Sequence, residues 1–205
     1  MENNIVKFTI IVICFIMAAT NRDGLNKRDR RLLTAAMAAT LAADFFLVLI
    51  FAYLPGLVFF CAVQMVYAVR CSGKRILLFM PAVLVIPVVF FAYADDILIT
   101  LAITYAQLFI ISYACMIKAL WRGRFPKPNS VLIFVGMTLF VLCDVNVALW
   151  NLGHMGFITN HQVINFASGA MWLFYAPSQV CLALSGIKFQ RDKQAITAHC
   201  HSERE

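Results

Sequence analysis

The fold is decided by the stretch LLTAAMAATLAADFFLVLIFA, residues 32–52, in which Asp44 is the only charged residue. A second stretch of the same kind, VLIFVGMTLFVLCDVNVALWN, covers residues 131–151 and holds Asp144 as its only charge. Each has the length of about 20 apolar residues that a helix needs to cross a bilayer. A charged side chain at bilayer depth costs on the order of 3 kcal/mol unless it is paired, solvated or protonated. The two aspartates are therefore the strongest indication of function in the sequence.

Composition predicts a membrane protein over the whole chain. Hydrophobic residues make up 62% of the 205 and charged residues only 13%, which is too apolar for a soluble domain of this length. The apolar runs are continuous and do not alternate, so they indicate helices and not a β-barrel. We expect an all-α, polytopic membrane helix bundle of about seven transmembrane helices. Their approximate ranges are 5–20, 32–52, 57–71, 76–94, 97–117, 131–151 and 165–187.

The chain is expected to form a single domain. Residues 1–190 make the transmembrane bundle, and residues 191–205 make a short cytoplasmic tail that we expect to be disordered. The run at 5–20 has no basic segment before it and a basic block directly after it. This order is typical of a retained membrane span and not of a cleaved signal peptide.

The basic residues gather in alternate loops. Of the 17 Lys and Arg, all except Lys7 lie in the segments 22–31, 70–75, 118–127 and 188–204. By the positive-inside rule, the N-terminus is outside and the C-terminus is cytoplasmic. The net charge of +7 is then a topology signal, and it requires no nucleic-acid partner. The compact loops favour a bacterial plasma membrane as the location.

Asp44 and Asp144 share a predicted depth, because each lies about eight residues, or roughly 12 Å, from the outer end of its helix. Polar side chains on the returning helices lie at comparable depth. These are Gln64, Tyr67, Tyr105, Gln107, Tyr175 and Gln179. Such groups often serve only to hydrogen-bond helices together. Amides and hydroxyls would do that without an ionisable proton, so two aspartates at one depth favour a chemical role.

Four stretches resemble the YhhN-like lysoplasmalogenase family. The segment 42–67 contains AADFFL and then GLVFFCAVQMVY, similar to the family's Gly-Asp-x-x-Leu helix and its Gly-x-x-x-Phe-x-x-x-His-x-x-Tyr helix. The segment 136–144, GMTLFVLCD, resembles the family's helix with a small residue, Phe and Ser-Asp. The segment 175–185, YAPSQVCLALS, resembles its final helix, Tyr-x-x-x-Gln/His followed by Ser. The order and approximate spacing match over most of the chain.

Three residues depart from the family pattern. Ala43 replaces the Gly before the first Asp, Cys143 replaces the Ser before the second, and Gln64 replaces the His of the third helix. Replacing His by Gln keeps hydrogen bonding but removes a group that titrates near neutral pH. The family usually has eight helices, and we expect this chain to lack the counterpart of the first.

The resemblance implies hydrolysis of the vinyl-ether bond of lysoplasmalogens to a fatty aldehyde and a glycerophospho-base. Vinyl ethers are hydrolysed by protonation at carbon and attack of water on the resulting oxocarbenium ion. This chemistry needs one protonated carboxyl and one group that stabilises the cation or orients water, a division of labour also used by glycosidases. We therefore expect Asp44 and Asp144 to be catalytic. The expected substrate-binding residues are Gln64, Tyr67, Tyr175 and Gln179.

The expected partners are the membrane and a lysophospholipid substrate, with no cofactor, no metal site and no protein partner. A proton-coupled transporter stays open as an alternative, because paired intramembrane carboxylates also serve proton relays. The two aspartates lie one hundred residues apart on parallel helices, as in a parallel repeat. A retinal protein is disfavoured, because the last helix has no lysine before Lys188.

Overall fold

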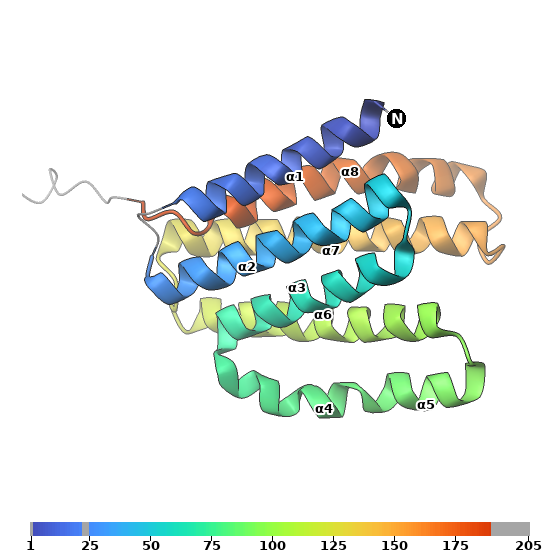
Figure 1. The fold of residues 1–205 in the computed structure, drawn as a ribbon, viewed down its shortest axis with the longest axis horizontal. Helices are drawn as coiled ribbons and strands as arrows, with labels where there is room; N and C mark the ends of the chain where they lie inside the picture. The colour runs from blue at the N-terminus through green and yellow to red at the C-terminus, as the bar shows by residue number, and fades with distance from the viewer. Residues whose placement is uncertain (1, 22–24, 190–205) are drawn as a thin grey trace, which may run out of the picture.

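A computed structural model describes residues 2–21 and 25–189, and within them the chain is helical without strands. The predicted tail at 191–205 lies outside the described residues. Figure 1 shows the helices running side by side in one bundle. Their bounds are α1 Glu2–Thr20, α2 Lys27–Asp44, η1 Phe45–Ile50, α3 Tyr53–Ser72, η2 Lys74–Phe79, α4 Met80–Val83, α5 Val85–Ala94, α6 Ile97–Trp121, α7 Lys127–His154 and α8 His161–Leu184.

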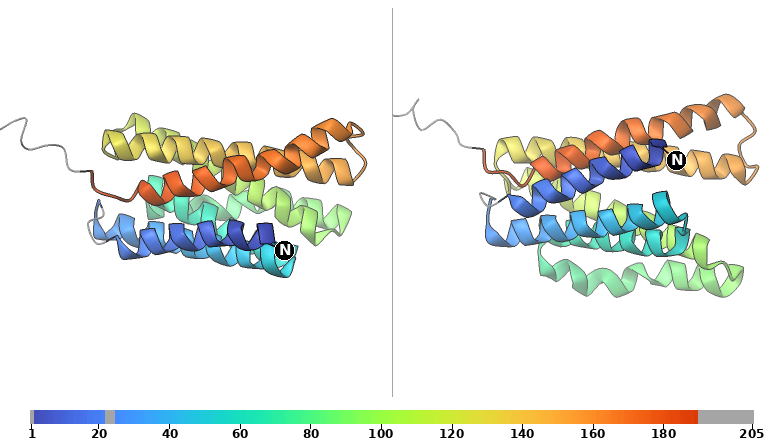
Figure 2. Two further views of the ribbon diagram at one scale, coloured as in Figure 1. Left: turned by 90° about the horizontal axis from the view of Figure 1, so that it is seen from above. Right: turned by 45° about the horizontal axis from the view of Figure 1, so that its top comes forward.

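Six helices form a closed ring. α1 packs against α2 and α8, α2 packs against α3, and α3 packs against α6, while α7 and α8 form a long, closely packed hairpin. The ring closes between α6 and α7, which pack against each other far less closely than the other neighbours do. α5 lies outside the ring against α6, and the views in Figures 1 and 2 agree on this arrangement.

Several helices begin before the apolar runs that predict them, because their first turns and caps are polar. The side chain of Asn26 accepts a hydrogen bond of 2.7 Å from the Asp29 amide and starts α2 five residues before the predicted run at 32–52. Asp96 also caps its helix, α6, by accepting from the amides of Leu98 and Ile99, and α6 begins at Ile97 as predicted. Short polar side chains of this kind satisfy amides that have no partner in the first turn.

The predicted helix at 76–94 is interrupted. It consists of the 3-10 helix η2 followed by α4 and α5. A proline inside a helix donates no hydrogen bond to the carbonyl four residues earlier. Pro87 therefore leaves the carbonyl of Val83 without its helical partner, and α4 ends at Val83. Hydropathy alone does not show this break, because proline interrupts the backbone hydrogen bonds and not the apolar pattern.

Five helical segments in the described residues are long and apolar enough to cross a membrane, whether they are one helix or several in succession. They are Lys27–Ile50, Tyr53–Ser72, Lys74–Ala94, Ile97–Trp121 and Lys127–His154. Asn4–Thr20 is apolar but shorter. The outer surface carries many exposed large apolar side chains, among them Phe166 and Leu173, at 69% and 70% exposure. Exposed apolar surface on this scale is typical of a surface that faces lipid. The predicted all-α fold is confirmed, and the candidate spans are consistent with a membrane bundle. The count of seven spans and the orientation stay predictions.

We expect cysteines placed at Lys27 and Arg122 to react with a membrane-impermeant maleimide only from the cytoplasmic side. Cysteines at Asp95 and Met155, near the opposite ends of α5 and α7, should react only from the outside. All four positions are exposed, so burial does not hide any of them. Labelling of intact cells and of inverted vesicles measures this. If Lys27 and Arg122 label on opposite faces, the predicted topology is wrong.

Candidate functional site

Asp44 is buried where α2 ends, and it is held by a tyrosine from α8. The hydroxyl of Tyr175 donates a hydrogen bond of 2.6 Å to Oδ2 of Asp44, and the two residues are 3% and 5% exposed. The helix changes directly after the aspartate into the π-helical turn η1. Such π-bulges are frequent at functional sites because they redirect the side chains around them.

Asp144 on α7 is held in the same way by α6. The hydroxyl of Tyr105 donates a hydrogen bond of 2.6 Å to Oδ2 of Asp144. In contrast to Asp44 and Tyr175, both of these residues are only partly buried. The pair lies at the loosely packed contact between α6 and α7.

Aromatic rings connect the two carboxyl–tyrosine pairs. Phe140 of α7 packs edge-on against Tyr175, with ring centroids 5.8 Å apart. On its other side it packs against Phe60 of α3 at 6.1 Å. The Phe60 ring then contacts Tyr105 at 5.9 Å. Since Phe140 is 1% exposed, the two carboxyl–tyrosine pairs are joined through the interior of the helix bundle and not over its surface.

The remaining predicted residues lie in the ring's interior. Gln64 accepts a hydrogen bond of 2.6 Å from Ser112 of α6 through Oε1. Gln179 donates to its neighbour Ser178 at 3.4 Å. Tyr67 is 2% exposed. Nε2 of Gln64, the hydroxyl of Tyr67 and Oε1 of Gln179 are buried and make no hydrogen bond within the protein. Buried polar atoms of this kind commonly bind ordered water or a ligand.

The structure thus brings Asp44 together with Tyr175, and Asp144 together with Tyr105. Gln64 is paired with Ser112, which the sequence analysis did not single out. Gln107 on α6 is partly buried, and its Oε1 is buried without a hydrogen bond within the protein. Within the described residues, no group of three or more His, Cys, Asp or Glu side chains is arranged to hold a metal ion.

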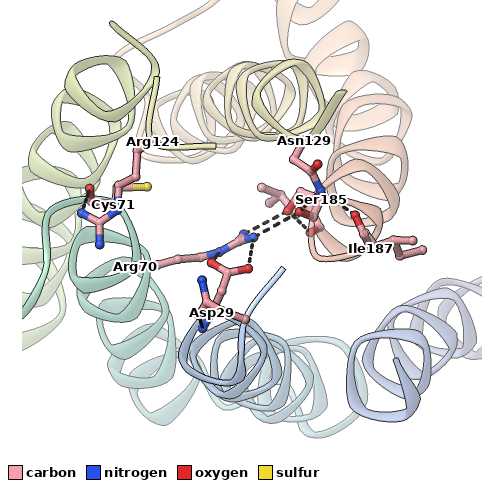
Figure 3. Close-up of polar contacts among 9 residues, drawn as sticks. Asp29, Arg70, Cys71, Arg124, Asn129, Ser185 and Ile187 are labelled. Carbon is pink, nitrogen blue, oxygen red and sulfur yellow. Dashed lines mark hydrogen bonds and ion pairs between the residues drawn. The ribbon is translucent and has the colours of Figure 1, made fainter. Parts of the chain in front are cut away.

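A buried ion pair at the other end of the bundle was missed. Arg70 of α3 donates to both carboxylate oxygens of Asp29, at 2.8 and 3.0 Å, and to the hydroxyl of Ser185 at 2.9 Å. Asn129 of α7 donates to the carbonyls of Ser185 and Ile187. Figure 3 shows these side chains meeting in the middle of the ring.

The sequence analysis counted Arg70 among the basic loop residues, but it is 2% exposed. Its spacing offers one signal that could have identified it. Arg70 lies three residues after Tyr67 and six after Gln64, so it continues the polar face of α3 toward the basic end of the bundle.

A model of the YhhN family matches residues 3–186, which is nearly the whole of the described chain. The match includes the first apolar helix. The comparisons with curated proteins and with solved structures found no match.

We expect Asp29→Leu to lower the free energy of unfolding by about 3–5 kcal/mol, because it leaves the buried Arg70 guanidinium without its counter-charge. The double variant Asp29→Leu/Arg70→Met should recover part of this loss, since it removes both charges. Reversible unfolding of the detergent-solubilised protein measures both. Arg31→Gln, an exposed charge on the same helix, is the control. A single variant as stable as this control would show that the ion pair is not a structural requirement.

Proposed function

The chain belongs to the YhhN family, and on this premise we propose that it is an integral-membrane hydrolase of the lysoplasmalogenase type. Its substrate is a lysophospholipid whose vinyl-ether bond is cleaved to a fatty aldehyde and a glycerophospho-base. The proposed location is a bacterial plasma membrane.

The observation that carries the proposal is the pair of carboxyl–tyrosine contacts within the membrane bundle. Each aspartate is held at 2.6 Å by a hydroxyl from a different helix, which fixes the carboxyl while leaving its second oxygen available. Protonation of the vinyl ether requires one carboxylic acid, and the cation that forms requires a second negative or dipolar group. Asp44 and Asp144 supply one fixed carboxyl for each of these two roles.

The two carboxyls lie at different helix contacts, and this supports a route for the substrate. Asp144 and Tyr105 lie at the loosely packed contact between α6 and α7, whereas Asp44 and Tyr175 join α2 to α8. We infer that a single-chain lipid enters between α6 and α7, so that Asp144 is the first carboxyl it meets. A lipid reaching the site laterally keeps its acyl chain in the bilayer throughout.

The unpartnered atoms of Gln64, Tyr67 and Gln179 supply donors and an acceptor for the second reactant. Hydrolysis consumes one water molecule, which must reach the buried centre and be oriented there. Buried waters typically make about three hydrogen bonds to polar groups that would otherwise be unsatisfied. These three side chains are proposed to hold the water or the polar part of the substrate.

A proton-coupled transporter is the second candidate, and one observation favours it. Asp44 and Asp144 each lie 17 residues, about 26 Å, from the first residue of their helices, and each is paired with a tyrosine of another helix. A repeated arrangement of this kind is typical of carriers with parallel repeats. Aldehyde release from lysoplasmalogen by the purified protein distinguishes the two, because a carrier leaves its substrate unchanged.

We expect Asp44→Asn and Asp144→Asn each to lower the rate of aldehyde release by about 10²–10⁴-fold, the usual contribution of general acid–base catalysis. Asparagine keeps the size of the side chain but lacks the acidic proton and the charge. The measurement is aldehyde formation in detergent, with elution on gel filtration showing that each variant folds.

The matched control is Asp95→Asn, the same chemical change at an exposed position. Asp95 has a left-handed backbone with φ of 49°, which asparagine also tolerates. This control should retain full activity. Near-normal hydrolysis by either folded site variant would remove that aspartate from the mechanism.

Tyr105→Phe is expected to lower the rate by roughly 10–100-fold, because a hydrogen bond to a charged group contributes about 1.5–3 kcal/mol. The phenylalanine ring can keep the contacts with Phe60 and Phe109. Tyr113→Phe is the control, since Tyr113 also lies on α6 and hydrogen-bonds α7, through Thr138 at 3.1 Å, without touching an aspartate. Equal activity in the two variants would argue against a role for the Tyr105–Asp144 contact beyond joining the helices.

A further inference from the structure

A cavity of about 260 Å³ opens at the basic end of the bundle, beside the buried Arg70–Asp29 pair. It lies between the segment that enters α2 and the connection from α6 to α7. Its lining includes Asn26, Arg28, Asp29, Arg70, Arg124 and Phe125. The proposed hydrolase function uses none of these side chains.

The cavity is positively charged. Among the described residues, three guanidinium groups line it against one carboxylate, that of Asp29. Both oxygens of this carboxylate already accept hydrogen bonds from Arg70. The Asp29 carboxylate therefore does not neutralise Arg28 and Arg124, and their charges act on a ligand in the cavity. A cavity with an excess of guanidinium groups attracts an anion, and guanidinium groups match phosphate geometry particularly well.

The surrounding structure fixes Arg124 and adds positive charge beside Arg28. Arg124 donates a hydrogen bond of 2.6 Å from Nη1 to the carbonyl of Cys71, which fixes one side of its guanidinium and leaves the other nitrogens free to donate. Arg28 lies in the first turn of α2, a helix of 18 residues, and the amides of that turn add partial positive charge at the same point. The Phe125 ring packs below Arg70, 5.5 Å from its guanidinium carbon, and forms an apolar wall.

We propose that this cavity is a binding site for an anionic phosphoryl group, supplied either by the headgroup of a phospholipid or by free phosphate. The volume is below the range of about 300–1,000 Å³ that is typical of pockets for drug-sized ligands, and it suits a phosphate with its nearest substituents. The basic loops place the cavity at the level of lipid headgroups, where basic pockets between membrane helices bind anionic lipids.

The phosphoryl group in this cavity does not belong to a substrate at the aspartates. Arg28 and Asp44 are 16 residues apart on the continuous helix α2, which is about 24 Å. Five bonds of about 1.5 Å separate the phosphorus of a lysoplasmalogen from its vinyl-ether oxygen, a reach of at most about 8 Å. The cavity is therefore a second site, and its occupancy does not depend on the proposed hydrolysis.

The test measures binding of two probes to the purified full-length protein. Phosphatidylglycerol and phosphatidylcholine are compared by native mass spectrometry from detergent, and inorganic phosphate is titrated against chloride in a thermal-shift assay. The variant is Arg28→Gln/Arg124→Gln. The control is Arg31→Gln/Lys127→Gln, which removes two exposed charges from α2 and α7 without touching the lining.

We expect the cavity variant to lose at least tenfold in affinity for the anionic probe, and the control to change less than twofold. Binding of phosphatidylglycerol alone identifies a lipid headgroup as the source, and binding of inorganic phosphate as well identifies a site for the free ion. Arg124 also donates a hydrogen bond to the Cys71 carbonyl, so Arg28→Gln is tested alone as well. This single variant should lose at least threefold in affinity for the anionic probe. Equal losses in cavity and control variants, or no preference for either anionic probe, would overturn the proposal.

Discussion

The bidentate ion pair between Arg70 and Asp29 is the interaction on which the basic end of the bundle depends. It joins α3 to α2, and through Ser185 it also joins both to α8. The guanidinium and the carboxylate are 1% and 6% exposed, so each depends on the other as its charged partner. A buried charge of this kind is tolerated only when its partner is fixed, which makes the relative positions of three helices a condition for its stability.

The pairs Asp44–Tyr175 and Asp144–Tyr105 apply the same constraint further along the bundle. They connect helices that hold few apolar contacts in common, since α6 and α7 pack loosely and α2 reaches α8 across the ring. Apolar side chains give little preference for one neighbour over lipid in a membrane, whereas a polar group in hydrocarbon must find a partner. The polar residues therefore select which helices meet, and the apolar residues fill the space between them.

Much of this architecture could be predicted from the sequence, for identifiable reasons. A lone charge inside a long apolar run is conspicuous, so Asp44 and Asp144 could be identified directly. Tyr175 and Tyr105 could be identified because their helices place them at a depth similar to that of the aspartates. The assignment of each tyrosine to its aspartate could not be predicted, because it depends on which helices are neighbours. The burial of Arg70 could not be recognised, because it lies at the end of an apolar run and next to basic loop residues. The π-helical turn after Asp44 leaves no mark in the hydropathy pattern.

The two polar levels together fix the position of α8 along the bundle. Ser185 is held at the basic end by Arg70 and Asn129, and ten residues earlier Tyr175 is held by Asp44. A helix rises 1.5 Å per residue, and a hydrogen bond tolerates far less than that displacement. A slip of α8 by one residue would therefore break the contacts at both levels at once. An anion bound by Arg28 and Arg124 would lie beside the Arg70–Asp29 ion pair, which also holds Ser185. Its binding would therefore stabilise the end of α8. The position of that end determines where Tyr175 lies, and Tyr175 in turn holds the Asp44 carboxyl.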